Sequence, residues 1–143
     1  MDLNKFTLKA QEALQEAQNT AVRRNHQQVD GEHLMYALLE QSDGLAPRLV
    51  ERIGAPLQEM TARVEDALGK IPSVTGGATE SGKIYITQRL NGILVKAVDE
   101  AARLKDEFVS VEHLLLALAG SDKNSAPARI LGEYGIGRDK LID

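Results

Sequence analysis

The sequence predicts an all-α domain built from two four-helix repeats that pack as a pseudo-twofold pair. Three observations support this fold class. Leu and Ala, which are good helix formers, make up most of the apolar residues, with little enrichment of β-branched residues. These residues recur at helical spacing along most of the 143-residue chain. The second half of the chain also repeats the pattern of the first.

The first repeat, residues 6–70, should begin with two capped helices. The first helix follows Thr7, which stands at the N-cap, and runs to about Asn25. The second starts after Asp30, whose carboxylate can cap it, and Gly44 marks its end. The residues expected to face inward are Phe6, Ala10, Ala13, Leu14, Ala17 and Ala21, followed by Leu34, Met35, Leu38 and Leu39.

Two further helices should complete this repeat. Pro47 suits the first turn of a short third helix, and Gly54 stops it. Residues 71–83 contain Pro72 and several glycines without an apolar period, which predicts a linker after the fourth helix. The apolar stripes of the third and fourth helices are Leu49, Val50 and Ile53, then Leu57, Met60, Val64 and Leu68.

An offset of 80 residues aligns the two repeats. It places Thr7 on Thr87, and the run Glu32-His33-Leu34 on Glu112-His113-Leu114. An offset of 81 then places Ile53-Gly54 on Tyr134-Gly135. A repeat of this length is a four-helix unit rather than a short solenoid module. The second repeat, residues 84–143, should therefore pack against the first around a shared core.

The composition excludes several functional classes. The chain has no Cys, which removes disulfide frameworks, thiolate zinc sites and cysteine nucleophiles. Its net charge of -4 and its 3% aromatic residues provide neither a basic face nor a stacking platform for nucleic acid. Its apolar runs fall far short of the roughly 20 residues that span a bilayer, and Met1–Ala10 lacks the features of a signal peptide. We therefore expect a cytoplasmic protein with no nucleic-acid or membrane partner.

The segment Gly77–Lys83 has the spacing of a phosphate-binding loop as far as the Lys. Ile84 stands where a Ser or Thr hydroxyl should hold magnesium, and no hydrophobic strand precedes the first Gly. The segment is therefore better explained as a flexible Gly-rich connection.

The Glu32-His33 and Glu112-His113 pairs contain zinc-ligand residue types. Neighbouring residues on a helix point about 100° apart, so one pair cannot easily chelate an ion. Attraction of the Glu to the helix N-terminus and bonding of the His to nearby backbone explain the pairs better. No nucleophile and base stand at a recognisable spacing. We therefore expect no metal site and no catalytic residues.

Two segments resemble the Clp N-terminal repeat: residues 106–118, with the sequence DEFVSVEHLLLAL, and their weaker copy at 26–39. Three further segments resemble in particular the ClpB-type disaggregases of this family: Phe6-Thr7, residues 44–49 and residues 71–77. The resemblance covers essentially the whole chain. It implies an eight-helix domain that binds exposed hydrophobic stretches of unfolded or aggregated proteins.

The resemblance also implies a longer protein around this domain. The full-length protein would be a homohexameric AAA+ motor that uses ATP and magnesium and cooperates with a DnaK-type chaperone system. The domain itself is expected to be monomeric, without cofactors and without catalytic activity. Two alternatives stay open: the adaptor-docking domain of a ClpA- or ClpC-type unfoldase that works with a protease, and a nucleotide-binding enzyme that uses Gly77–Lys83.

By motif, the resemblance places a polar substrate-handling cluster at Thr7, Asp106 and Glu112. Helix-start chemistry explains Thr7 and Glu112 equally well. The repeat partner of Asp106 is His26, so the two equivalent corners of the domain differ chemically. Four leucines are expected either to line an apolar groove for the client or to lie in the core: Leu90, Leu94, Leu114 and Leu115.

Overall fold

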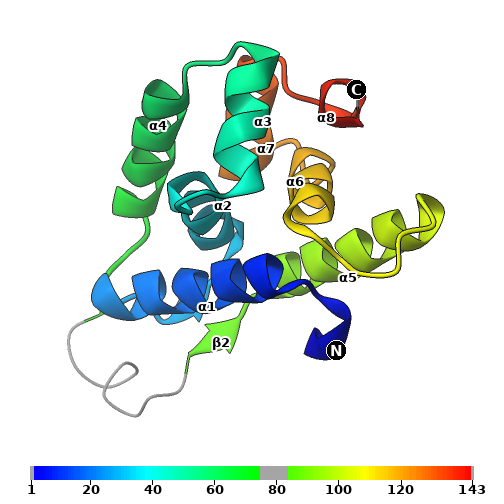
Figure 1. Cartoon of the computed structure of the whole chain (residues 1–143). Helices are drawn as coiled ribbons and strands as arrows, with labels where there is room; N and C mark the ends of the chain where they lie inside the picture. The colour runs from blue at the N-terminus through cyan, green and yellow to red at the C-terminus, as the bar shows by residue number, and fades with distance from the viewer. Residues whose placement is uncertain (1, 75–83, 143) are drawn as a thin grey trace.

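The computed structural model describes residues 2–74 and 84–142 of the chain. Within these ranges the chain forms eight α-helices, one short 3-10 helix and two short strands (Figure 1). The first repeat holds η1 (Leu3–Lys5), α1 (Leu8–Arg23), β1 (Gln28–Val29), α2 (Gly31–Glu40), α3 (Leu45–Ile53) and α4 (Leu57–Gly69). The second holds β2 (Tyr85–Ile86), α5 (Gln88–Arg103), α6 (Val111–Ala119), α7 (Ala126–Glu133) and α8 (Arg138–Ile142). The predicted all-α fold of two pseudo-twofold-related repeats is confirmed.

The two repeats begin with matching helices of 16 residues, α1 and α5. Thr7 and Thr87 are their N-caps, as the sequence predicts. Ala10 N donates to Thr7 Oγ1 at 3.2 Å, and Leu90 N donates to Thr87 Oγ1 at 3.0 Å. Each bond satisfies one of the backbone N–H groups that a helix N-terminus leaves without a partner.

Four of the five described residues with left-handed backbone stand at equivalent places in the two repeats, and the fifth, Asp43 (φ 54°), has no counterpart. Asn25 (φ 58°) and Lys105 (φ 61°) follow the first helix of each repeat. Gly54 (φ 95°) and Gly135 (φ 69°) follow the third, where glycine adopts this conformation without steric cost. The backbone conformation after the first and third helices is therefore repeated at the offsets of 80 and 81 residues found in the sequence.

The expectation that Gly44 ends the second helix is wrong. α2 ends at Glu40, and Gly44 is the N-cap of α3, which carries Pro47 in its first turn as predicted. The side chain of Gln41 donates to Lys9 O of α1 at 2.9 Å, so a tertiary contact holds the chain just past the end of α2. An added Cβ at Gly44 would lie 2.9 Å from Gln41 Cβ, which explains glycine at this position by close approach.

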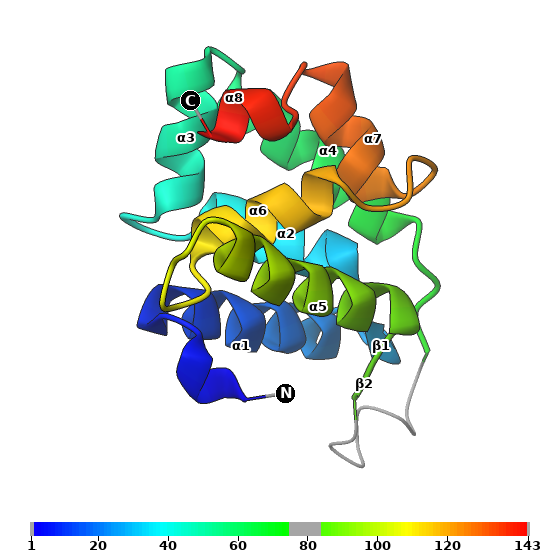
Figure 2. The same ribbon diagram turned by 90° about the vertical axis from the view of Figure 1, so that its right-hand side faces the viewer.

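The helices form three layers (Figure 2). α1 and α5 form one outer layer, α2 and α6 form the central layer, and α3, α4, α7 and α8 form the other outer layer. Leu34 and Leu38 of α2, and Leu114 and Leu118 of α6, are fully buried. Because both central helices are enclosed, the repeats share one core, as the sequence predicts.

Short backbone pairings tie each repeat to the other. β1 pairs in parallel with β2, so that Val29 faces Ile86. At the equivalent place, Phe6 forms a parallel bridge with Val109. The segment before the first helix of each repeat therefore lies against the first loop of the other repeat. No local sequence pattern predicts these pairings, since each strand has only two residues.

Among the described residues, every helix is too short or too polar to cross a membrane. Only the start of the predicted linker is described. There, Val74 N donates to Asn25 O at 2.8 Å, and Ser73 Oγ donates to Arg24 O at 3.1 Å. Most of the linker, including the segment Gly77–Lys83 with the spacing of a phosphate-binding loop, lies outside the described residues.

Candidate functional site

An apolar groove of about 430 Å³ lies between α1, α5 and the β1–β2 pair. α1 and α5 lie side by side and run in opposite directions (Figures 1 and 2). None of the described residues that line the groove is charged, and its polar lining consists of amide side chains. The lining residues are Leu3, Gln11, Leu14, Gln15, Ala17, Gln18, Val29, Ile84, Ile86, Leu90, Asn91 and Leu94.

The four leucines expected at a groove or in the core divide into two pairs. Leu90 and Leu94 line the groove from α5, although their side chains are only 1% and 5% exposed. Leu114 and Leu115 lie in the core at 0% and 1% exposure and do not line the groove. Leu114 and Leu115 of α6 are therefore core residues rather than groove residues.

Ten of the twelve lining residues were not predicted as groove residues. Leu14 was predicted only on the inward-facing stripe of α1, and Ile84 and Ile86 precede α5, where no local pattern marks them. The repeat offered a usable signal for Leu14, since the 80-residue offset places it on the predicted groove residue Leu94. Both repeats contribute equivalent residues to a site near the pseudo-twofold axis. A groove residue in one repeat therefore predicts that its aligned partner in the other repeat also lines the groove.

The predicted polar cluster lies at the corner where α1 begins, which we call the acidic corner and define as Thr7, Asp106 and Glu112. Thr7 N donates to Val109 O at 2.9 Å, which holds the start of α1 against the loop between Asp106 and Glu112. Asp106 is 50% exposed, and Glu112 lies half-buried in the first turn of α6. None of the three lines the groove.

His33 and His113 take the same position, three residues after the N-caps of α2 and α6. Asp30 N donates to His33 Nδ1 at 2.9 Å, and Ser110 N donates to His113 Nδ1 at 2.8 Å. Each histidine thereby completes a capping box, the reciprocal bonding of N-cap and third helical residue. This confirms the prediction that the two imidazoles bond to nearby backbone.

The remaining ring nitrogen of each histidine meets a different partner. With Nδ1 accepting, Nε2 carries the proton: His33 Nε2 donates to His26 Nδ1 at 2.8 Å, and His113 Nε2 donates to Asp106 Oδ2 at 2.8 Å. Burial, followed by the charge of His26, lowers the pKa of His33 to about 4. Neither nitrogen of either ring has a lone pair left for a metal, and the described residues hold no cluster of three or more potential ligands.

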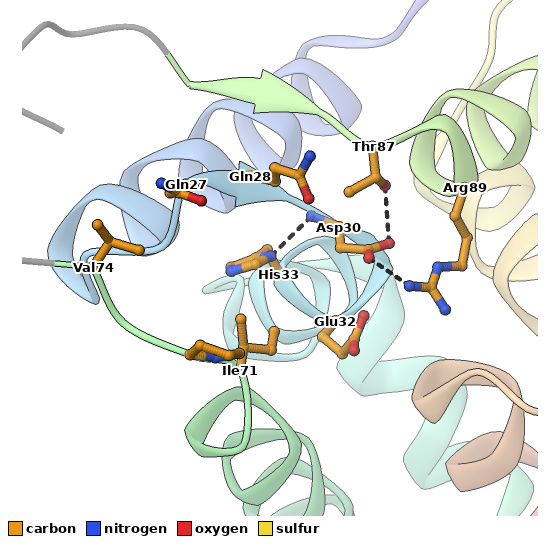
Figure 3. A pocket seen from close by; sticks show the side chains of 10 residues that line it. Gln27, Gln28, Asp30, Glu32, His33, Ile71, Val74, Thr87 and Arg89 are labelled. Carbon is orange, nitrogen blue, oxygen red and sulfur yellow. Dashed lines mark hydrogen bonds and ion pairs between the residues drawn. The ribbon is translucent and has the colours of Figure 1, made fainter. Parts of the chain in front are cut away.

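A polar pocket of about 300 Å³ lies at the opposite corner, where α5 begins (Figure 3). Thr87 Oγ1 donates to Asp30 Oδ1 at 3.1 Å, and Arg89 Nη2 donates to Asp30 Oδ2 at 2.9 Å. Asp30 belongs to the first repeat and its partners to the second, so these bonds join the repeats. Glu32 lines the same pocket, and burial raises its pKa. Glu32 Oε1 is buried without a hydrogen-bond partner among the described residues. Because Asp30 bonds to both Thr87 and Arg89 across the repeats, we interpret these three residues as a structural joint.

The cap at Thr7 leads to a stability prediction. Thr7→Ala should lower the free energy of unfolding by about 1 kcal/mol, because Ala10 N loses its acceptor. Thr7→Asn, which retains a capping oxygen, should keep the wild-type value. Thr87→Ala is the matched control and should cost more, since Thr87 Oγ1 also donates to Asp30. Urea unfolding measures all three, and an equal loss in Thr7→Asn would contradict the capping role.

Comparison with known proteins places this fold in a family. Residues 5–134 match the Clp repeat (R) N-terminal domain. The ClpB chaperone of Nitratidesulfovibrio vulgaris is 46% identical over 142 residues, and that of Bacillus anthracis is 42% identical over 142 residues. Each alignment covers 99% of this chain, and the chain spans 16% of the length of each of these relatives.

Solved structures agree in fold. The Hsp104 N-terminal domain from Candida albicans superposes with a TM-score of 0.81 at 24% identity, covering 96% of this chain and 86% of that one. The N-terminal domain of the ClpV1 ATPase from E. coli gives 0.80 at 22% identity, covering 98% and 83%. The chain therefore belongs to the Clp repeat N-terminal domain family and matches the N-terminal region of ClpB chaperones.

Proposed function

We propose that this domain recognises substrates for a ClpB-type protein disaggregase. It binds exposed apolar segments of unfolded or aggregated proteins and passes them to an AAA+ motor elsewhere in the full-length protein. The observation that carries this proposal is the groove, whose lining combines uncharged amides with seven Leu, Ile and Val side chains: Leu3, Leu14, Val29, Ile84, Ile86, Leu90 and Leu94. Such a surface favours apolar segments of many sequences.

The ClpB relatives support the wider setting of this proposal. The full-length protein is proposed to be a cytoplasmic homohexamer that binds ATP and magnesium and cooperates with a DnaK-type chaperone system. The domain itself contributes recognition as a monomer, and the chemistry of ATP belongs to the motor. Client binding should be micromolar or weaker, since a chaperone must release what it holds.

In this proposal, the acidic corner gives the domain a preference for client segments that have Lys or Arg next to the apolar stretch. Asp106 is half-exposed, and Glu107 beside it is exposed. Leu8 and Phe108 expose 77% and 46% of their surface, and the bond from Thr7 N to Val109 O holds their two segments together. A client segment that leaves the groove would meet carboxylates next to apolar surface. A Lys or Arg there would gain a screened, exposed ion pair worth at most about 1 kcal/mol.

A titration tests the proposed function. The probe is an acetylated and amidated heptapeptide of alternating Leu and Ser, and the readout is the set of backbone amide shifts in an NMR spectrum. We expect shifts at Leu14, Ile86 and Leu94 in the groove. A second peptide with two Lys at one end should also shift Asp106 and Glu112. If the amide shifts of the groove residues do not change at millimolar peptide, the proposal is overturned. If the amide shifts of Asp106 and Glu112 do not change with the Lys-containing peptide, the acidic corner has no role in client binding.

One observation favours a second candidate, a docking site for a folded adaptor. The exposed Leu8 and Phe108 are close in sequence to the acidic corner and do not line the groove. Among proteins of this fold are the ClpD chaperone of Arabidopsis thaliana, associated with a caseinolytic protease, and a ClpV N-domain in complex with a VipB peptide. A ClpA- or ClpC-type adaptor would shift the amides of Leu8 and Phe108 and leave those of Leu90 and Leu94 unchanged.

A further inference from the structure

The two short backbone pairings of this fold are equivalent, and their outer edges differ. Thr7 N donates to Val109 O at 2.9 Å, and at the equivalent place Thr87 N donates to Val29 O at 3.1 Å. Successive residues of an extended segment direct their N–H and C=O groups to alternate sides. The backbone groups of Phe6 and of Ile86, one residue earlier in each case, therefore face away from the pairing.

At Phe6 these outward groups already have partners. Phe6 N donates to Leu3 O at 3.0 Å, so η1 lies along this edge. Gln11, on the first full turn of α1, donates through Nε2 to Phe6 O at 2.9 Å and to Leu3 O at 3.0 Å. One amide side chain thus joins the edge residue to a backbone segment seated beside it. The turn that precedes Phe6 therefore covers this edge.

At Ile86 the equivalent edge opens onto the apolar groove. Among the described residues, no partner beyond the β1–β2 ladder bonds the N–H or C=O of Ile86, whose surface is 55% exposed. The 80-residue offset places Asn91 on Gln11, and Asn91 lines the groove with Ile86 and Leu90. The edge therefore offers an N–H, a C=O and an amide side chain next to an apolar surface.

We propose that a client segment binds here as an added strand, with its backbone paired to Ile86 and held by the Asn91 amide as Gln11 holds η1. This proposal rests on the proposed function and specifies its ligand: an extended, uncharged, apolar polypeptide that is recognised by hydrogen bonds to its backbone. Alternate side chains of such a strand would enter the groove over Leu14, Leu90 and Leu94. Backbone pairing accepts many sequences, and the uncharged lining matches an uncharged segment.

Two N-methylated forms of the Leu–Ser heptapeptide test this pairing. One carries methyl groups on the Leu nitrogens and the other on the Ser nitrogens, so each blocks hydrogen bonds on a different edge of the strand. With Leu side chains in the groove, only one edge faces Ile86. We expect calorimetry to show at least a tenfold weaker affinity for one form and less than a threefold change for the other. Binding should also slow hydrogen exchange at the Ile86 amide.

Equal affinities of the two methylated forms would overturn the added strand while leaving the proposed function intact. Failure of the unmodified peptide to bind would instead overturn the proposed function. Dimerisation of the domain with protection of Ile86 in the absence of peptide would assign the edge to a second copy and also overturn the proposal.

A matched pair of variants separates backbone recognition from simple apolar burial. Asn91→Leu enlarges the apolar surface but removes the amide, so we expect about fivefold weaker peptide binding. Gln88→Leu makes the same kind of change at an exposed position of α5 that does not line the groove. This control should bind the peptide with wild-type affinity. Tighter binding by Asn91→Leu would contradict the role of the amide.

Discussion

Leu114→Ala is expected to lower the free energy of unfolding by about 2–5 kcal/mol. The Leu114 side chain is fully buried in the central layer, where α6 packs against both repeats. Truncation removes apolar contacts and leaves a cavity that the enclosed helix cannot close by moving. Urea unfolding followed by circular dichroism measures the loss. A change below about 1 kcal/mol would contradict the assignment of Leu114 to the core.

The groove residue Leu14 supplies the contrasting variant. Leu14 is half-buried at the groove, so Leu14→Ala should cost less stability than Leu114→Ala and weaken the Leu–Ser peptide about fivefold to tenfold. Leu114→Met, which nearly conserves volume, should stay folded and bind the peptide with wild-type affinity. Weakened peptide binding by Leu114→Met would indicate that the α6 leucines belong to the client-binding site.

Acid should destabilise the domain through His33. The pKa of His33 is lowered to about 4 in the folded state, against about 6.5 in the unfolded chain. A lowered histidine pKa means that the folded state binds fewer protons, so its stabilising contribution is complete above pH 6.5. That contribution is lost as the pH falls from 6.5 towards 4, by about 3 kcal/mol in total. Burial also lowers the pKa of His26, which adds to the same trend.

His33→Gln isolates this effect from the titration of carboxylates. Gln is a natural partner in a capping box, so it can still accept from Asp30 N, and it cannot be protonated in this range. We expect the variant to lose about 3 kcal/mol less than the wild type between pH 7 and pH 4. Free energies of unfolding from urea titrations at several pH values make the comparison. Parallel curves for the two proteins would contradict the buried neutral His26–His33 pair.

Local chemistry accounts for the parts of the fold that the sequence predicted well. Thr7, Thr87 and Asp30 cap their helices because a side-chain oxygen satisfies N–H groups within three residues of itself. Gly54 ends α3 because its left-handed backbone suits glycine. These interactions span a few residues and need no knowledge of the rest of the chain.

The errors and omissions all involve contacts between distant segments. α2 stops at Glu40 beside a contact between Gln41 and α1, so the helix end depended on a neighbour 32 residues away. β1 and β2 contain two residues each, too few for any alternation to mark them as strands. Leu94 and Leu114 have the same helical spacing in sequence, and only the packing of α5 and α6 separates groove from core.

The sequence by itself determined the helices, the two repeats and their pseudo-twofold relation, because apolar periodicity and capping are local and the 80-residue offset is visible in the residue order. The sequence also shows that the corners at His26 and Asp106 differ chemically, but only the tertiary structure decided how exposure differs between the repeats. The groove lies between the antiparallel helices α1 and α5, η1 covers the edge at Phe6, and the equivalent edge at Ile86 is left facing apolar surface. Equivalent sequence positions acquire different exposure because burial is a property of all neighbours at once.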